Sequence, residues 1–351
     1  MNFNEFVTDL DGKRCVKCEK DAKFTGVDPK KAWYCQECFI QMVRNKFRSA
    51  LSKKKIYKDA DARETLIVFD GTPSGAFLLH QIDDALKQIT YKRLMVKPTV
   101  LVLVSVTDPE KIQHVMDRIQ DIKTALLENV NWIIAHVACC MYTEIKDFDN
   151  TKCNGTEKIP EYIEMLSACS VPTYREELKR IMKEKCLQKI SEALHISKCM
   201  VPDDADILGR LAIDQLCLGR GGSLSPIVTV LDKRANFMLI RPLCDVSKKE
   251  VVIYNYLCGI DKHCIQIAGT NSEVKSVQSL TDSFIRTLED EKFYSTINTV
   301  LSTASKIHNT TSGKDGSHCS LCFIESADDL CTTCLAILKT CTGDLINRFI
   351  Q

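Results

Sequence analysis

The 351-residue sequence predicts an α/β protein with a doubly wound parallel sheet, closed at each end by a cysteine-rich metal-binding segment. Two observations support this. Apolar, β-branched runs alternate with segments whose apolar residues recur at helical spacing, which is typical of a parallel sheet covered by helices on both faces. Four Cys-x-x-Cys pairs, two near each end, use eight of the nineteen cysteines. The length suffices for one sizeable body with small appendages.

The elements follow from the spacing of apolar residues. Phe39, Val43, Phe47 and Leu51 recur every fourth residue, which predicts a helix directly after the first cysteines. Short apolar runs bounded by Gly, Pro or Asn predict the strands, and longer periodic segments predict the helices. The predicted strands are 65–69, 98–106, 131–137 and 199–201, and the helices that follow the first strand are 77–89, 109–126, 158–168, 173–195, 205–218 and 281–307.

Two polar segments interrupt this pattern of strands and helices. Residues 147–156 are predicted to form an exposed loop, and residues 309–317 a linker. We therefore expect three parts: 1–58 with a zinc knuckle and a basic helix, 59–308 with the α/β body, and 309–351 with a second cysteine knuckle and a helix.

The cysteine pairs have the spacing of metal ligands. Two Cys-x-x-Cys pairs complete the tetrahedral set of four sulfurs that zinc favours. Sixteen residues separate the front pairs and eight separate the back pairs. The predicted zinc ligands are Cys15, Cys18, Cys35 and Cys38 at the front, and Cys319, Cys322, Cys331 and Cys334 at the back.

Disulfides and a redox motif are the alternatives to metal binding. Residues 1–10 contain Glu5 and Asp9 and lack the apolar core of a signal peptide. No run of eighteen apolar residues indicates a membrane span. We therefore expect a cytoplasmic protein without a membrane role, whose thiols stay reduced. No Cys-x-x-Cys pair follows the first strand, where a thioredoxin-type motif would lie. The other eleven cysteines are expected to be small buried apolar residues.

The net charge of +1 excludes a uniformly basic protein, but one segment is strongly basic. Residues 41–58 hold seven cations and no acid. The run is either a solvated helix face or a surface for the phosphate backbone of a nucleic acid, and its position between a cysteine knuckle and the first strand favours the second. The candidate contacts are Arg44, Lys46, Arg48, Lys53, Lys54 and Lys55.

The turn after the first strand is where a doubly wound sheet binds its ligand. It reads Asp70-Gly71-Thr72-Pro73-Ser74-Gly75. Glycines permit close backbone approach, and the next helix offers its N-terminus to an anion. Alone this signal is weak, because any strand-to-helix turn favours Gly, Pro and Ser.

The combination of cysteine knuckle, basic helix, strand, turn and helix resembles the PP-loop ATP pyrophosphatase-like (adenine nucleotide alpha hydrolase-like) proteins that thiolate tRNA. The segments 207–222, 241–243 and 249–255 extend the match. Together with the terminal cysteine pairs, they resemble the cytoplasmic tRNA 2-thiolation protein 2 family across roughly residues 13–345.

The turn departs from the Ser-Gly-Gly-x-Asp-Ser pattern of that resemblance. Asp70 replaces the first Ser, Thr72 the second Gly and Ser74 the Asp, so that only Gly71 survives among the defining positions. A carboxylate at position 70 would repel phosphates, which disfavours ATP binding.

The thiol set is also broken. Active members carry a Cys-x-x-Cys and a third cysteine, for persulfide chemistry or an iron–sulfur cluster. Here the corresponding segment is Cys169-Ser-Val-Pro172, and Cys264 lies near the third position. With both motifs degenerate, the chain is expected to be a non-catalytic subunit. A lone Cys169 thiol of depressed pKa is the alternative.

The resemblance implies partners. It implies a heterodimer with a catalytic thiolation paralogue, which places sulfur from a thiocarboxylated ubiquitin-like carrier on the wobble uridine of tRNA Lys, Glu and Gln. We expect the basic run and Arg220, in a Gly-rich turn, to contact tRNA phosphates. A self-sufficient sulfurtransferase and a zinc-dependent adaptor without a tRNA role are the alternatives. His136, His318, Asp203, Asp204 and Asp206 are expected to be structural.

Overall fold

The computed structural model describes residues 12–28, 32–53, 55–57, 63–88, 94–234, 237–267, 275–291, 293, 295–307, 318–326 and 328–341. A six-stranded sheet has the order β5-β4-β3-β6-β8-β7, in which only β7 is antiparallel to its neighbour. Its strands are β3 (Glu64–Phe69), β4 (Lys97–Val104), β5 (Asn131–His136), β6 (Lys198–Met200), β7 (Leu231–Lys233) and β8 (Met238–Ile240). A two-stranded ribbon, β1 (Phe24–Thr25) and β2 (Trp33–Tyr34), lies near the N-terminus.

The order of the strands fixes the place of the candidate site. The chain runs from β3 outward through β4 to β5 and then returns to add β6 on the other side of β3. The topological switch point therefore lies between the carboxyl ends of β3 and β6, where sheets of this kind bind ligands. All four predicted strands are present. The sequence pattern missed β7 and β8, which are only three residues long.

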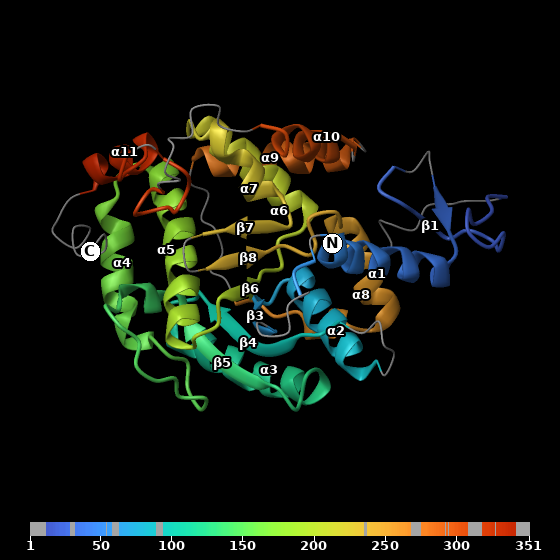
Figure 1. Cartoon of the computed structure of the whole chain (residues 1–351), viewed down its shortest axis with the longest axis horizontal. Coiled ribbons are helices and arrows are strands. Elements are labelled where there is room, and N and C mark those ends of the chain that lie inside the picture. The colour runs from blue at the N-terminus through green and yellow to red at the C-terminus, as the bar shows by residue number, and fades with distance from the viewer. Residues whose placement is uncertain are drawn as a thin grey trace.

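Helices cover both sides of the sheet. In Figure 1, α1, α2 and α8 are grouped on one side of the strands, and α4 and α5 lie on the other. The helices are α1 (Gln36–Lys53), α2 (Pro73–Lys87), α3 (Pro109–Ala125), α4 (Ile159–Ala168), α5 (Pro172–Ala193), α6 (Ala205–Cys217), α7 (Leu224–Val228), α8 (Lys248–Cys258), α9 (Val277–Asp290), α10 (Ser295–Ala304) and α11 (Thr332–Thr340). The predicted fold class is confirmed.

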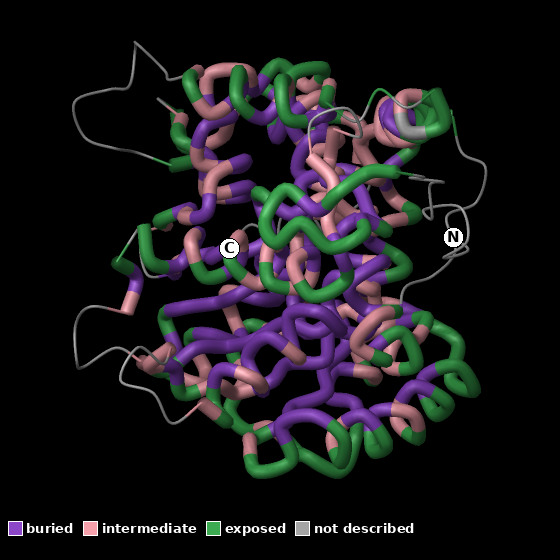
Figure 2. Tube along the Cα trace, turned by 90° about the vertical axis from the view of Figure 1, so that its right-hand side faces the viewer, coloured by how far each residue is buried: buried purple, intermediate pink, exposed green. Residues whose placement is uncertain are grey.

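The core is the sheet and the helix faces turned towards it. Five of the six residues of β3 and five of the six of β5 are buried, as a parallel sheet covered on both faces requires. Figure 2 shows the buried strands enclosed by helices whose outer turns are exposed. This rigid sheet holds the loops at its carboxyl edge in place.

Two expectations need correction. The predicted helix 281–307 is two helices, α9 and α10. The predicted exposed loop 147–156 is exposed only in its first part, because Asn154 pairs with Ala135 at the end of β5 and Cys153 is buried beside it. The predicted linker 309–317 and Ile89 lie outside the described residues.

Helix α1 docks on α2 and α8 through its cations. The apolar face predicted from the sequence is buried, from Phe39 to Leu51. Arg44 donates to the hydroxyl of Tyr254 at 2.9 Å. Lys46 lies 2.7 Å from a carboxylate oxygen of Glu250, which is 1% exposed. The basic run contains no acid of its own, but the fold supplies the acids from other helices.

No helix within the described parts of the chain combines the length and apolar character needed to cross a membrane.

Replacing Lys46 by Met should lower the free energy of unfolding by about 1–3 kcal/mol, because the buried Glu250 carboxylate loses its cationic partner. Denaturant unfolding measures the change. The double variant Lys46→Met/Glu250→Gln should recover part of the loss, since glutamine still accepts from the Ser247 amide in the capping box of α8. Wild-type stability in the single variant would contradict the assignment.

Candidate functional site

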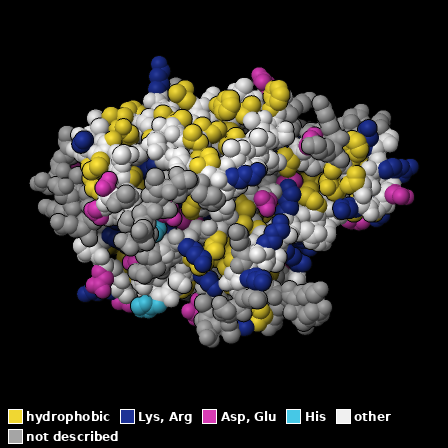
Figure 3. Space-filling view, turned by 45° about the horizontal axis from the view of Figure 1, so that its top comes forward, with side chains coloured by type: hydrophobic (Ala, Val, Ile, Leu, Met, Phe, Trp, Pro, Cys, Tyr) yellow, Lys and Arg dark blue, Asp and Glu magenta, His cyan; other side chains and the backbone are white. Residues whose placement is uncertain are grey.

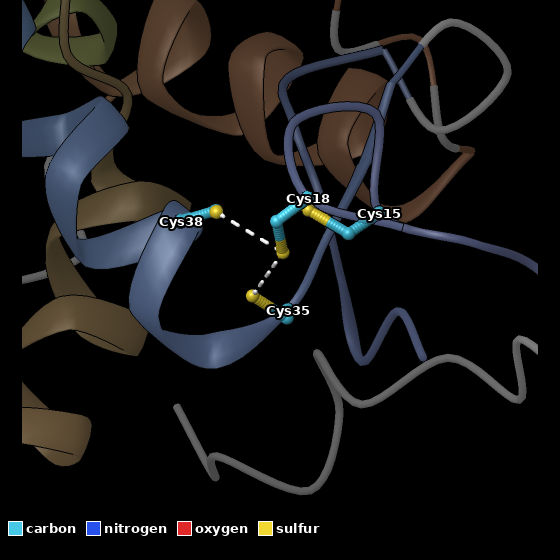
Figure 4. A group of neighbouring side chains, drawn as sticks. All are labelled: Cys15, Cys18, Cys35 and Cys38. Carbon is cyan, nitrogen blue, oxygen red and sulfur yellow. Dashed lines mark hydrogen bonds between the residues drawn. The ribbon is translucent and has the colours of Figure 1, made fainter. Parts of the chain in front are cut away.

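The front cysteines converge on one point. Cys15 and Cys18 lie on a turn, and Cys35 and Cys38 flank the start of α1 (Figure 4). The Cys18 sulfur is 3.5 Å from the Cys35 sulfur and 3.6 Å from the Cys38 sulfur. All four sulfurs lie within 4.8 Å of one another. We call this set the N-terminal quartet.

The back cysteines form a second group, the C-terminal quartet. It consists of Cys319, Cys322, Cys331 and Cys334, whose sulfurs also lie within 4.8 Å of one another. Three of them are fully buried, whereas Cys18 of the N-terminal quartet is exposed. The predicted spatial grouping of both quartets is confirmed.

The two quartets share one local architecture. In each first pair the residue after the second cysteine has a positive φ, 61° at Glu19 and 60° at Phe323, and its amide donates to the carbonyl of the first cysteine. Cys35 and Cys331 each lie directly before a helix, and Cys38 and Cys334 fall in its first turn. The two quartets differ in sequence spacing because the connections between their Cys-x-x-Cys pairs differ in length. The local arrangement around the cysteines is the same.

This architecture favours a thiolate at the first cysteine of each quartet. Helix N-termini carry partial positive charge, which stabilises an adjacent anionic sulfur. Burial opposes ionisation of Cys15, but amide donors from Cys35, Lys17 and Cys18 outweigh it and lower the pKa of that thiol to about 6. A hydrogen bond from the Cys322 thiol is the main cause that lowers the pKa of Cys319 to about 6, and the same contact raises the pKa of Cys322. In the N-terminal quartet the pKa values of Cys18 and Cys38 are likewise raised.

The geometry fits a tetrahedral metal. A Zn–S bond of about 2.3 Å places tetrahedral sulfurs about 3.8 Å apart. The observed 3.5, 3.6 and 3.7 Å separations between sulfurs are close to that value. His318 is not a member of the C-terminal quartet within the described residues. Each quartet can therefore hold one metal ion through four sulfurs.

The loop after β3 satisfies its own hydrogen bonds. Gly71 has a φ of 76°, which favours glycine. The Asp70 carboxylate accepts from the amide of Thr72 at 3.2 Å and from its hydroxyl at 2.6 Å. The Thr72 hydroxyl in turn caps α2 by accepting from the amide of Gly75. Donors that would face a phosphate are turned towards a carboxylate of the same loop.

A buried hydrogen bond closes the switch point. Ser74, at the start of α2, donates to Asp204 at 2.6 Å, and Asp204 follows β6 and caps α6. Burial, reinforced by the charge of Asp206, raises the pKa of Asp204 to about 7. The two loops that flank the switch point are thus joined to each other. The expectation that Asp204 supports a helix N-terminus is confirmed.

A third segment covers the loop. The amide of Ile265 donates to the carbonyl of Gly71 at 3.0 Å, and the carbonyl of Ile267 accepts from Ser105 and Val106 after β4. A Cβ added to Gly71 would lie 2.1 Å from the Ile265 carbonyl oxygen and 2.7 Å from the Ile267 side chain. The segment that contains Ile265 and Ile267 therefore packs directly on the predicted nucleotide loop.

The two remaining thiols of interest are not joined in one site. Cys169 is buried, and its backbone forms a bridge with Cys341 after α11. Its sulfur donates to the Val171 carbonyl. Cys264 precedes Ile265, and burial together with Asp261 raises its pKa to about 11. Among the described residues, the two quartets are the only groups of three or more side chains placed to hold a metal ion.

The basic run divides into two parts. Arg44 and Arg48 approach Asp84 at 3.7 and 3.5 Å, and Lys46 pairs with Glu250. Each of these three cations therefore has an acidic partner within the protein, and their contact with phosphate stays a prediction. Lys53 and Lys55 are exposed at the end of the run, and Lys54 lies outside the described residues. Figure 3 shows Lys and Arg side chains gathered between the projecting N-terminal segment and the body.

Arg220 does not lie on the surface. It is only 5% exposed, and its guanidinium bonds to Glu177 and Gln215. The expected phosphate contact is therefore corrected, because the Gly-rich turn directs this side chain into the protein. His136 is buried and accepts from the amide of Ala138, and burial lowers its pKa to about 4, in line with a structural role.

Comparison with known proteins supplies the family. A model described as cytoplasmic tRNA 2-thiolation protein 2 matches residues 276–342. The protein of that name from Caenorhabditis elegans is 72% identical over 346 residues, which cover 99% of both chains. The Caenorhabditis briggsae protein is 70% identical over 345 residues, 98% of this chain and 99% of its own. A Drosophila yakuba protein is 27% identical over 86% of this chain and 74% of its own.

A solved structure supports the fold. The U34-tRNA thiolase NcsA from Methanococcus maripaludis, determined with its 4Fe-4S cluster, superposes with a TM-score of 0.61 at 15% identity. The match covers 92% of this chain and 95% of the thiolase. The sequence identity to the nematode proteins across nearly the whole chain shows that it belongs to the cytoplasmic tRNA 2-thiolation protein 2 family.

Proposed function

We propose that this chain serves in cytoplasmic tRNA 2-thiolation as a subunit that does not activate the uridine itself. The observation that carries the proposal is the closed carboxyl edge of the sheet. Asp70 occupies the donors of the loop, Ser74 bonds across the switch point to Asp204, and Ile265 packs on Gly71.

Activation of uridine for sulfur transfer needs a site that holds the phosphates of ATP. Such a site works through unoccupied amide donors and a helix N-terminus. Here the amide of Thr72 already donates to a carboxylate, and a second charge of the same sign would be repelled. The chemistry then falls to a catalytic paralogue, with which this chain forms a heterodimer, and the sulfur comes from a thiocarboxylated ubiquitin-like carrier.

The contribution of this chain is the positioning of tRNA, so that the wobble uridine of tRNA Lys, Glu and Gln reaches the catalytic paralogue. Lys53 and Lys55 support this role, since both are exposed at the end of the basic run. Cations that contact phosphates orient a nucleic acid without reading its sequence. Arg44, Lys46 and Arg48 instead hold α1 in the fold.

The alternatives are weaker. A self-sufficient sulfurtransferase needs an open loop and a set of thiols, and Cys169 is buried against the C-terminal segment. An adaptor without a tRNA role conflicts with the 72% identity to a named tRNA 2-thiolation protein. Both quartets are proposed to hold zinc, which would supply cross-links between distant segments of the chain.

The isolated chain should show no saturable binding of Mg·ATP in a calorimetric titration. The variant Asp70→Ser, which restores a hydroxyl to the loop, should also fail to bind, because Ile265 and Ile267 still cover Gly71. Saturable binding by the wild-type chain would contradict the proposal of a non-catalytic subunit.

Replacing Lys53 and Lys55 by Gln should weaken tRNA binding and reduce the slope of log K against log salt by about 1 per lysine. Binding titrations at several salt concentrations measure the slope. Lys46→Gln is the matched control, because Lys46 is already paired with Glu250 and its loss should leave the slope unchanged. Equal slopes in all three proteins would exclude the two lysines from the tRNA contact.

Metal analysis of the purified chain should find two zinc ions per molecule. Cys18→Ser should remove one ion with little change in the unfolding temperature, since Cys18 is exposed. Cys322→Ser should remove one ion and lower the unfolding temperature of the body, since Cys322 is buried. The zinc assignment fails if the wild-type chain retains no metal after purification without chelators.

A further inference from the structure

The side chain of Arg220 lies between the α/β body and the C-terminal quartet. Its Nη2 is 3.3 Å from the sulfur of Cys334 and 3.6 Å from the sulfur of Cys331. Its Nη1 donates to Glu177 and, at 2.8 Å, to Gln215. One guanidinium therefore touches two proposed metal ligands and a buried carboxylate.

The turn after α6 creates this position. Gly219 has a φ of 79°, and the amide of Arg220 donates to the Gln215 carbonyl at 2.8 Å, which ends the helix. The quartet is attached to the same turn, because the Thr333 hydroxyl donates to the Leu218 carbonyl at 2.6 Å. The backbone thus fixes the distance between Arg220 and the sulfurs.

The positive charge of Arg220 would balance the negative charge of a metal ion bound by four thiolates. Four thiolates around a divalent ion carry a net charge of −2, and three of these four cysteines are fully buried. A buried charge of that size needs donors and a counter-charge. Arg220 supplies both, since its side chain is 3% exposed and its hydrogen bonds reach two of the sulfurs.

The N-terminal quartet is built differently. Its neighbouring cation, Lys20, has a side chain that is 62% exposed and pairs with Glu37 at 2.7 Å. Cys18 of that quartet is exposed to water, and the segment that contains β1 projects from the body in Figure 1. Only the C-terminal quartet has a buried arginine bonded to its sulfurs among the described residues.

Arg220 also begins a buried ion-pair network, in which each carboxylate lies between two arginines. Glu177 pairs with Arg220 and Arg180. Arg180 also pairs with Glu184, which in turn pairs with Arg234. Asp232 pairs with Arg234 and Arg241. Arg241 approaches Asp203 at 3.4 Å. Asp203 precedes Asp204, so the network leads from the quartet to the switch point of the sheet.

We propose that Arg220 is an outer-coordination residue of the C-terminal metal centre, and that through it a bound metal stabilises the α/β body. Arg220 holds the sulfurs of Cys331 and Cys334 in position through two hydrogen bonds and supplies a positive charge beside them. In return the metal-bound thiolates keep Arg220 directed at Glu177. The C-terminal centre is therefore part of the body, whereas the N-terminal centre is an appendage.

The proposal rests on metal binding and is tested in the Cys18→Ser background, where only the C-terminal quartet can bind zinc. Zinc affinity is measured for the full chain by competition with a chromophoric chelator. Arg220→Gln should weaken binding about 10–100-fold, the range seen when outer-shell partners of a metal are removed. Arg220→Lys should weaken it less, because one ammonium keeps the charge but not the fork of two donors.

Loss of Arg220 leaves Glu177 buried without one of its partners, so a second variant separates folding from metal binding. Arg220→Gln/Glu177→Gln removes both charges and should regain stability in the metal-free state without regaining zinc affinity. Its unfolding temperature should fall less on addition of a chelator than that of the parent. Arg210→Gln, on the outer part of α6, is the matched control and should leave zinc affinity unchanged.

Each outcome decides one proposal. Zinc affinity within twofold of the parent in Arg220→Gln and in the double variant would overturn the role of Arg220 and leave the metal centre intact. If the double variant fails to fold, a zinc affinity of Arg220→Lys equal to that of the parent would also overturn the role of Arg220. A parent that binds no zinc overturns both this inference and the proposed metal site.

Discussion

The main-chain contact between Ile265 and Gly71 determines what the carboxyl edge of this sheet can do. The backbone conformation at Gly71 turns the loop after β3 towards a segment that returns from α8, and the contact leaves no room for a side chain at position 71. Asp70 completes the closure by accepting the donors of the loop. At the edge where related sheets bind a ligand, the loop is therefore bonded to other parts of the same protein, which supports the proposed non-catalytic role.

The contacts proposed with tRNA therefore lie at the periphery of the molecule and not at the carboxyl edge of the sheet. Cys18 of the projecting N-terminal quartet and the end of the basic run are exposed, and both are adjacent to α1. The cations of α1 attach this helix to α2 and α8. The C-terminal quartet is instead embedded against α6 through Arg220. Two cysteine quartets with the same local turn are thus placed differently, one in a projecting segment and the other packed against the body.

The sequence predicted the fold class, four of the six strands of the sheet and both quartets, because hydrophobic period and ligand spacing are local signals. It could not show that Asp84 and Glu250 pair with the basic run, since both acids come from helices distant in the chain. The same limit misplaced Arg220, whose Gly-rich surroundings indicated a surface turn although its buried partner Glu177 lies 43 residues away. The three-residue strands β7 and β8 were missed, and their length alone is not the reason, because β6 is equally short and was predicted.

The most direct measurement is the amount of 2-thiouridine in bulk tRNA from cells that lack this chain. Rescue compares the wild-type chain with Thr72→Asp, which keeps a cap for α2 but adds a negative charge to the loop. A required subunit without a working nucleotide loop predicts that 2-thiouridine is lost and that both proteins restore it fully. Unchanged 2-thiouridine after removal, or restoration by the wild-type chain alone when the variant is equally folded, would contradict the account.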